Sequence, residues 1–262
     1  MKPNSHVVDY GTFSNIGQRR QNQDAVMVMQ ALMPSGQEGQ LFVVADGMGG
    51  HPGGGVASRL ACDGLKQHFE KELKNKIQNS PKDIARRLSE AILRIDRHIR
   101  RQGLQDSSLE DMGTTLSCLM ISDTYSIIAH VGDSRVYRLR NGVLSCLTVD
   151  HTFVQDMIFE GEVDPGRAHL HPLRHMLTRA VGTGETLPLV DTRTDRLKEM
   201  DCFLLCTDGL FNVLADSSMK DRLSRQEAAS ESAEELVRQA IKAGARDNVS
   251  AVVVKIGCIL SS

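Results

Sequence analysis

Short apolar runs separated by polar and glycine-containing segments make up most of the chain, and this pattern predicts β-strands. The runs that predict strands are 7–12, 25–29, 41–45, 114–121, 125–131, 135–140, 143–147, 202–207 and 249–256. Arg140, Asn141 and Gly142 lie between two of these runs, and Asn-Gly is typical of a two-residue hairpin turn. We therefore expect antiparallel neighbours.

A second pattern, with apolar residues three or four positions apart, predicts two successive helices. The first helix is marked by Val56, Leu60, Phe69, Leu73 and Ile77. The second is marked by Ile84, Leu88, Ile92, Ile95 and Ile99. Ser80 and Pro81 supply a cap and a first-position proline for the second helix, and Asp83 is an acid in its first turn.

Shorter helices are predicted in the second half of the chain, near 152–160 and 217–224. Ser232 to Glu235 has the composition of a capping box, and we expect it to begin a last helix that ends at Gly244.

The order of these elements favours the α+β class with antiparallel sheets, because a strict β-α-β alternation is absent. About nine strands are many for one open sheet, so we expect two packed sheets with helices outside. The 262 residues contain no repeat, low-complexity tract or long linker, and we expect a single domain over 1–262.

Composition excludes several classes of function. The net charge of −2 gives no electrostatic reason to expect nucleic acid or an anionic membrane as a partner. No apolar run approaches the ~20 residues that span a bilayer, and the N-terminus lacks a secretory signal, so a cytoplasmic location is expected. The six cysteines form no C-x-x-C pair, and we expect them to be buried and reduced rather than in disulfides or a zinc site.

Aspartates recur where apolar runs end or begin. They are Asp24, Asp46, Asp133, Asp208 and Asp247. One such residue is typical of a turn, but five indicate a shared role. If these ends meet in space, the carboxylates repel one another unless cations are bound. Oxygen ligands without a Cys/His set favour Mg²⁺ or Mn²⁺ over Zn²⁺.

Two arginines, Arg19 and Arg20, lie just before Asp24. A guanidinium can bind a phosphate through two parallel hydrogen bonds. An arginine beside a divalent-metal site indicates phosphoryl chemistry, in which two metal ions activate a shared water and stabilise an oxyanion.

Eight motifs in this chain resemble, in order, those of the metal-dependent protein phosphatases (the PPM or type 2C serine/threonine phosphatases) in their bacterial form. They are RRQNQD (19–24), ADGMGGH (45–51), MGTTL (112–116), HVGDSRVYRLRNG (130–142), LTVDHTFV (147–154), HPLRHMLTRAVG (171–182), LLCTDGLFNVL (204–214) and ARDNVSAVVV (245–254). The resemblance covers about residues 7–257.

This resemblance implies a four-layer α-β-β-α sandwich with two central antiparallel sheets flanked by helices. It also implies metal-dependent hydrolysis of phosphoserine and phosphothreonine on proteins. In this family pattern Asp46 bridges two Mn²⁺ or Mg²⁺ ions, and the backbone carbonyl of Gly47 binds one of them. Asp208 and Asp247 complete the other ion's ligands.

The remaining matches imply supporting roles. Asp24 supports the two core ions through water, and Asp133 with Asp208 resembles the pair that holds a third, weaker ion in bacterial relatives. Arg19 matches the phosphate-binding arginine, and Arg20 is the second choice. The implied mechanism is a one-step attack by a water bridging the ions, without a phosphoenzyme and without a cysteine nucleophile.

The chain departs from the family pattern at Met48, where eukaryotic members often carry a histidine proposed as general acid. A thioether cannot donate a proton, so either water protonates the leaving group or His51 assists. Residues 155–180, here called the flap segment, correspond to the family's variable flap. His171 fits a family position in it, while His169 and His175 are expected at its surface, where they are candidates for substrate contact rather than ligands of zinc or a fourth metal ion.

Two other classes of function compete with a phosphatase. One is a pseudophosphatase that binds phosphoproteins without turnover, which the presence of Asp46, Asp208 and Asp247 disfavours. The other is a nuclease-like phosphoesterase, which the absence of a basic face disfavours. We expect phosphorylated proteins as partners, including a Ser/Thr kinase whose action the protein opposes, and a monomer as the default.

Overall fold

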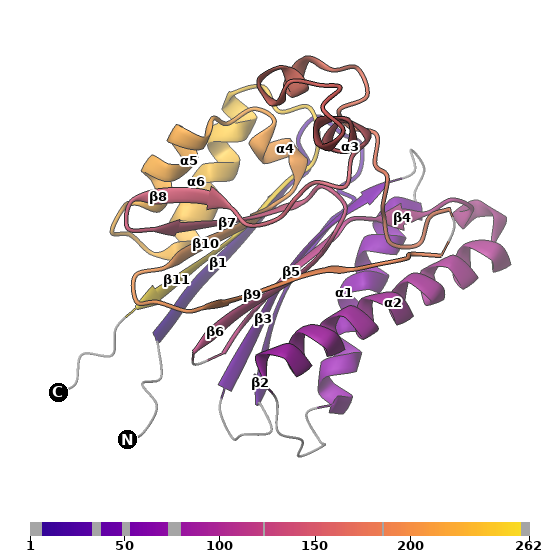
Figure 1. Ribbon diagram of the computed structural model, residues 1–262, viewed down its shortest axis with the longest axis horizontal. Coiled ribbons are helices and arrows are strands. Elements are labelled where there is room, and N and C mark those ends of the chain that lie inside the picture. Colours follow the sequence, from indigo (N-terminus) through magenta and orange to yellow (C-terminus); the bar gives the residue numbers. More distant parts are fainter. Residues whose placement is uncertain are drawn as a thin grey trace.

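The computed structural model describes residues 7–32, 38–48, 53–72, 80–122, 124–184 and 186–257, and it contains two antiparallel sheets with helices on their outer faces (Figure 1). The strands are β1 (Val7–Asn15), β2 (Asp24–Leu32), β3 (Glu38–Met48), β4 (Gly113–Thr114), β5 (Leu116–Ile121), β6 (Tyr125–Val131), β7 (Arg135–Arg140), β8 (Val143–Cys146), β9 (Asp191–Arg196), β10 (Cys202–Cys206) and β11 (Val249–Gly257). The helices are α1 (Gly53–Glu72), α2 (Pro81–Gln105), α3 (Phe153–Phe159), α4 (Asp208–Phe211), α5 (Asp216–Leu223) and α6 (Ala229–Lys242), with 3-10 helices η1 (Ser107–Leu109) and η2 (Pro165–Leu170).

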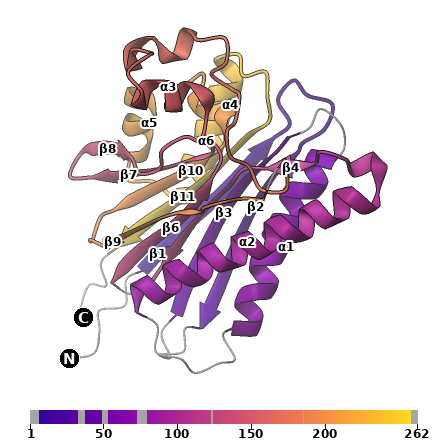
Figure 2. The ribbon, with the colours of Figure 1, turned by 45° about the vertical axis from the view of Figure 1, so that its right-hand side comes forward.

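Both sheets join strands that are distant in the sequence. One sheet has the order β1-β11-β10-β7-β8, and the other has the order β2-β3-β5-β6-β9, with the short β4 paired to β3. Figure 2 shows α1 and α2 lying across the outer face of the second sheet, and α5 and α6 lie beside the first sheet in both ribbon views. The predicted α+β class and the two packed antiparallel sheets are therefore confirmed.

Alternation of side chains along the central strands explains these layers. Phe42 and Val44 of β3 belong to the apolar cluster between the two sheets, while Leu41, Val43 and Ala45 belong to the cluster beneath α1 and α2. Successive side chains of a strand point to opposite faces, so a strand that is apolar throughout can serve both layers.

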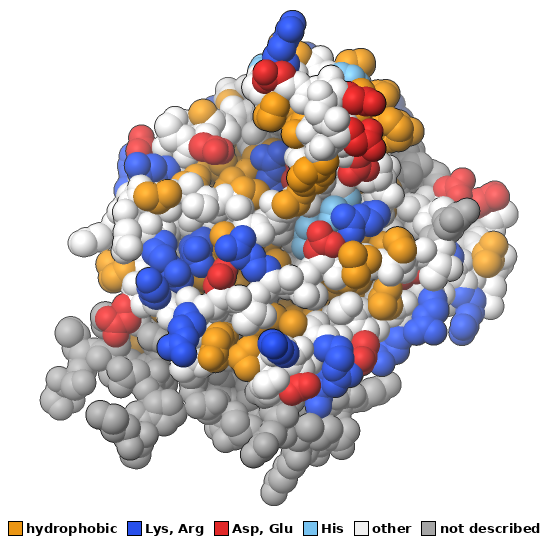
Figure 3. All heavy atoms as spheres, in the orientation of Figure 1, with side chains coloured by type: hydrophobic (Ala, Val, Ile, Leu, Met, Phe, Trp, Pro, Cys, Tyr) orange, Lys and Arg blue, Asp and Glu red, His pale blue; other side chains and the backbone are white. Residues whose placement is uncertain are grey.

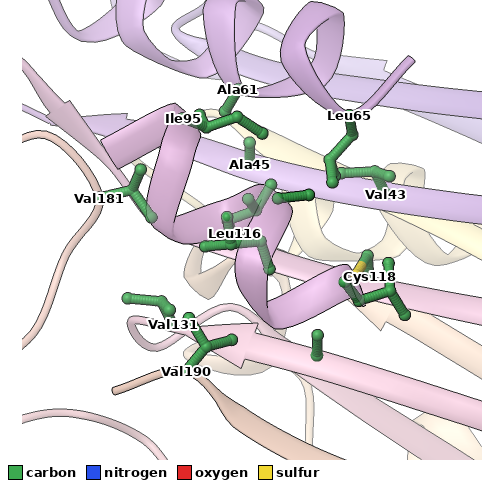
Figure 4. Close-up of a cluster of buried hydrophobic side chains, with 14 of the residues drawn as sticks. Val43, Ala45, Ala61, Leu65, Ile95, Leu116, Cys118, Val131, Val181 and Val190 are labelled. Atoms are coloured by element: carbon green, nitrogen blue, oxygen red, sulfur yellow. The ribbon is translucent and has the colours of Figure 1, made fainter. Parts of the chain in front are cut away.

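The cluster beneath the helices is shown in Figure 4, where Ala61 and Leu65 of α1 and Ile95 of α2 lie over Val43 and Ala45 of β3. All five side chains are buried. This packing fixes β3 along its length, and β3 carries Asp46 and Gly47 just before its last residue.

The strongest local signals of the sequence are confirmed. Ser80 caps α2, because its side chain accepts from the backbone N–H of Asp83 while the Asp83 side chain accepts from the backbone N–H of Ser80. Asn141 and Gly142 have φ values of 51° and 72°, the left-handed conformation that a type I′ hairpin turn requires. The first helix also forms, although Leu73 and Ile77 lie outside the described residues.

The predicted start of the last helix is wrong. The helix begins at Ala229 rather than at Ser232, whose hydroxyl donates to Glu227 Oε1. The backbone N–H of Ala229 donates over 2.8 Å to Asp9 Oδ2 of β1, so the cap comes from a distant strand. Gly244 follows the end of the helix with a φ of 93°, as predicted.

Two further differences concern the strands. β9 was not predicted, because its sequence DTRTDR has no apolar residue; it forms as an edge strand on β6. The predicted strand 114–121 is interrupted at Thr115, whose backbone N–H donates to the carbonyl of Asp46.

The cysteines are largely placed as predicted. Four of them are buried: Cys62, Cys118, Cys202 and Cys206. Cys202 and Cys206 lie on the same face of β10. Cys146 is exposed, contrary to expectation, because it lies at the end of the edge strand β8, and Cys258 lies outside the described residues.

Among the helices that the structure describes, none combines the length and apolar character needed to cross a bilayer.

Replacing Phe203 tests the layer between the sheets. Its side chain has no exposed area, and Phe203→Ala should lower the free energy of unfolding by about 3–5 kcal/mol through lost burial and an unfilled cavity. Phe159 is 70% exposed and is the matched control, with an expected loss below about 0.5 kcal/mol. Urea denaturation of both variants measures the difference, and equal losses would contradict this packing.

Candidate metal centre

A broad pocket contains six of the seven residues that the sequence singled out. Arg19, Asp46, Gly47, Asp133, Asp208 and Asp247 all line it. Asp24 does not line the pocket, but it is the direct cross-strand partner of Asp46 in the β2–β3 pair. Segments far apart in the sequence therefore converge at one end of the two sheets.

Asp46 is positioned through its backbone. Its N–H donates to Thr115 Oγ1, and its carbonyl accepts from the backbone N–H of Thr115 and from Thr114 Oγ1, all at 2.9 Å. Burial raises the pKa of Asp46 well above its usual range, and the negative charges of Asp24 and Asp208 add to this effect.

Asp24 has one satisfied and one unsatisfied carboxylate oxygen. Its Oδ2 accepts from Ser250 Oγ at 2.6 Å and from Thr207 Oγ1 at 2.9 Å. Its Oδ1 is buried and has no hydrogen-bond partner. Burial raises the pKa of Asp24 to about 7, although the two hydroxyl groups oppose this rise.

Asp133 follows β6 through Gly132, which has a φ of 104°. A Cβ atom on Gly132 would come within 2.6 Å of the Thr115 side chain, so a glycine is required there both by conformation and by space. Burial, with a further contribution from Asp208, raises the pKa of Asp133 to about 8.

Asp208 is the first residue of α4, directly after β10. Its Oδ2 accepts from Asn212 Nδ2 at 3.1 Å and lies 3.6 Å from His175 Nδ1, while its Oδ1 is buried without a partner. Burial and the neighbouring Asp247 raise the pKa of Asp208 to about 6.

Asp247 is paired with Arg19, whose Nη2 lies 2.6 Å from Asp247 Oδ2. This hydrogen bond raises the pKa of Arg19. Gly17 allows the two segments to approach, because a Cβ atom on it would lie 2.0 Å from the carbonyl oxygen of Asp247.

The charge and chemistry of this site fit hard divalent cations. Two buried carboxylate oxygens have no partner, and the carboxyl groups raise one another's pKa, so positive charge is in deficit. All side-chain donors are the oxygen ligands that Mg²⁺ and Mn²⁺ prefer. No group of three or more His, Cys, Asp or Glu side chains in the described residues already stands at the spacing of a metal cage. The carboxyl groups nevertheless share one electrostatic field, since neighbouring charges raise the pKa of Asp46 and of Asp208.

Gly47 has a packing role in addition to the predicted ligand role of its carbonyl. A Cβ atom on Gly47 would lie 2.1 Å from the carbonyl oxygen of Gly54 and 2.7 Å from that of Gln23. The absence of a side chain therefore lets the start of α1 and the β1–β2 loop pack directly against the end of β3. His51 lies outside the described residues.

Several supporting residues were missed by the sequence analysis. The hydroxyls that hold the aspartates belong to Thr115, Thr207 and Ser250. Each is a polar residue within or next to an apolar run, which is the one signal that could have identified it.

The flap segment approaches the site more closely than expected. His169 and His175 both line the pocket, and His175 is the one that reaches Asp208. Backbone hydrogen bonds of Met176 fix the chain next to His175. The N–H of Met176 donates to the carbonyl of Leu173, and its carbonyl accepts from the N–H of Phe153 at the start of α3. In Figures 1 and 2, α3 lies at the same end of the molecule as α4 and β4.

The known proteins that are similar to this chain in sequence and in structure are protein phosphatases. The model of the family described as "Protein phosphatase 2C" matches residues 13–253. The chain is 36% identical over 217 residues to the serine/threonine protein phosphatase PstP of Mycobacterium tuberculosis. The aligned part covers 83% of this chain but only 40% of that relative. It is 34% identical over 215 residues to the serine/threonine phosphatase stp of Listeria monocytogenes, covering 82% of this chain and 84% of that protein.

Among solved structures, the catalytic domain of PstP in complex with two manganese ions is similar, with a TM-score of 0.81 and 31% sequence identity. The match covers 97% of this chain and 100% of the chain in the PstP structure.

A buried pair of histidines, His130 and His151, supports the loop that carries Asp133. Their ring centroids are 4.7 Å apart. The Nδ1 atom of His151 accepts from the N–H of Gly132, and His130 Nε2 lies 3.1 Å from the carbonyl of Val149. Burial and the neighbouring His151 lower the pKa of His130 to about 3.

This shift predicts acid destabilisation. Between pH 6.5 and 3 the unfolded chain binds a proton at His130 that the folded chain does not, so the stability present above pH 6.5 falls as the pH decreases. Between pH 7.5 and 5.0, the protein should lose about 2 kcal/mol more stability than His130→Asn, which cannot titrate there. Chemical denaturation at both pH values measures this loss. His98→Asn, at an exposed position of α2, is the control and should keep the pH dependence of the unchanged protein. If His130→Asn also keeps that pH dependence, the acid destabilisation does not come from His130.

Proposed function

Because the chain belongs to the protein phosphatase 2C family, we propose that it hydrolyses phosphoserine and phosphothreonine on proteins and depends on two Mn²⁺ or Mg²⁺ ions. The observation that carries this proposal is the pocket in which buried carboxyl groups with raised pKa values lie beside an arginine. The names of the relatives and the two manganese ions of the PstP structure support it. We also propose that residues 1–262 act as one catalytic domain, in keeping with a family match over 13–253.

Four residues would hold the two core ions. Asp46 would bridge them, with the Gly47 carbonyl on one ion and Asp208 and Asp247 on the other. Asp24 would support the centre through water, and Asp133 with Asp208 would hold a third, weaker ion. When bound, the ions would supply Lewis acidity for an attacking water and positive charge beside the phosphoryl oxygens.

The chain's own residues prepare this chemistry. Thr207 and Ser250 donate to one oxygen of Asp24, and the other oxygen is buried without a partner. Thr115 fixes the backbone at Asp46, so the carboxylate is delivered from a rigid strand end. These contacts fix one oxygen of Asp24 and the backbone of Asp46 before the reaction begins.

Arg19 would bind the phosphate of the substrate. In the structure its guanidinium is held by Asp247, which keeps it in the pocket. When Asp247 serves as a ligand, the planar fork of Arg19 becomes available for two phosphoryl oxygens and stabilises their charge.

The proposed reaction uses neither a cysteine as nucleophile nor Met48 as proton donor. Burial raises the pKa of Cys62, Cys118 and Cys202 to about 12, and no cysteine is among the described residues that line the pocket. Met48, which lines the pocket, has no proton to donate, so water or His51 would protonate the leaving alkoxide. We expect phosphorylated proteins as substrates, a Ser/Thr kinase with opposing action as partner, and a monomeric protein.

Metal dependence tests the proposal directly. A phosphothreonine peptide should be hydrolysed with Mn²⁺ and not with EDTA, and Asp208→Ala should lower kcat/KM more than about 100-fold because a ligand is lost. Asp216→Ala removes an exposed aspartate of α5 and should change kcat/KM less than twofold, within roughly 0.5 kcal/mol. Activity no higher with Mn²⁺ than with EDTA refutes the phosphatase proposal, and full activity in Asp208→Ala refutes the ligand assignment.

Arg19→Lys tests phosphate binding. Lysine keeps the charge but not the planar fork, so kcat/KM for p-nitrophenyl phosphate should fall about tenfold and inhibition by inorganic phosphate should weaken. The neighbouring Arg20→Lys should leave both quantities close to those of the unchanged protein. The reverse result would assign the phosphate to Arg20.

A further inference from the structure

Three exposed arginines that line the pocket, Arg20, Arg174 and Arg246, take no part in the chemistry described above, and Arg174 belongs to the flap segment. Arg20 lies in the β1–β2 loop and Arg246 precedes β11, and both line the pocket. In the part of the chain that the structure describes, neither guanidinium has a hydrogen bond or an ion pair.

Asn248 holds the two segments together. Its Nδ2 donates to the carbonyls of Ile16 at 2.8 Å and Gln21 at 3.0 Å, and its Oδ1 accepts from the N–H of Gln23 at 2.8 Å. Asn248 is itself 4% exposed. One buried amide therefore binds the loop on both sides of Arg20 and lies two residues after Arg246, so both cations stand on a fixed part of the pocket wall.

The buried carboxyl groups lack positive charge nearby, whereas the exposed wall of the pocket carries cations without a carboxylate partner. Arg19 is paired with Asp247, but Arg20 and Arg246 pair with no carboxylate of the described residues. The whole chain has a net charge of −2, so these cations are not part of a generally basic protein.

A second arginine-rich surface shows the contrast. Figure 3 shows Lys and Arg side chains gathered over β7 and β9. There Arg138 and Arg193 share Asp195, and Arg140 forms two hydrogen bonds with Asp201. Those arginines are each paired with a carboxylate of the fold, whereas Arg20 and Arg246 are available to a ligand.

We propose that Arg20 and Arg246 select phosphorylated segments that carry acidic residues close to the phosphorylated residue. This inference rests on the proposed function, since it names the class of substrate for the same pocket. An extended peptide advances about 3.3 Å per residue, so cations on the pocket wall meet side chains within a few positions of the phosphorylated residue. Opposite charges there favour binding, and lysines would be repelled.

Paired peptides test this selection. Two phosphothreonine peptides that differ only in carrying Asp or Lys at the three positions on either side are compared by kcat/KM with Mn²⁺. The Asp peptide should be preferred at least tenfold, and the double variant Arg20→Gln/Arg246→Gln should reduce that preference about three- to tenfold, as expected for two exposed charge contacts. Its hydrolysis of p-nitrophenyl phosphate, which has no flanking residues, should be unchanged.

The matched control removes the same charge elsewhere. Arg101 and Arg225 are exposed and lie outside the pocket lining, and Arg101→Gln/Arg225→Gln should keep the preference of the unchanged protein. An unaltered Asp/Lys ratio in Arg20→Gln/Arg246→Gln, or an equal reduction in the control, overturns the proposal.

A binding measurement separates this proposal from the proposed function. Fluorescence polarisation with Mn²⁺ and labelled forms of the same two peptides, in which a phosphonate that cannot be hydrolysed replaces the phosphate, reports recognition without turnover. Tighter binding of the Asp peptide that is lost in Arg20→Gln/Arg246→Gln supports the selection even if no hydrolysis is found. Equal affinity for the two peptides contradicts the selection even if hydrolysis is fast.

Discussion

The burial of several carboxyl groups close to one another is the constraint around which this end of the molecule is arranged. Asp24, Asp46, Asp133 and Asp208 each have a raised pKa, and burial is the first cause in every case. A fold holds such groups together only if the surrounding structure is stable enough to offset their cost. The apolar layers between the sheets and beneath the helices supply that stability. Strands packed in these layers end at the site, so the layers hold the site residues in place.

The neutral groups around the carboxylates are as informative as the charges. Hydroxyls of Thr207 and Ser250 satisfy one side of Asp24, and Thr115 holds the backbone of Asp46. Asn248 joins the β1–β2 loop to the start of β11, close to the pair formed by Arg19 and Asp247. Each contact is made between segments that are far apart in the sequence, so the site is a product of the two-sheet arrangement rather than of any one motif.

Much of the fold could be predicted because its signals are local. The Ser80 capping box and the Asn141-Gly142 turn are complete within a few residues, and the structure confirms both. The start of α6 could not be predicted in the same way, since the N–H of Ala229 is bound by Asp9 of β1. β9 was missed for a related reason: its polar residues form a strand only because β6 offers an edge to pair with.

For the candidate site, the sequence by itself determined which residue types stand at the strand ends and that five aspartates recur there, because apolar periodicity and turn chemistry are properties of short segments. The tertiary structure alone decided that these carboxylates share one field, that Arg19 is held by Asp247 and that His175 reaches Asp208. Those facts depend on distances between segments up to 228 residues apart, and such distances are fixed only when two sheets pack and bring their ends together.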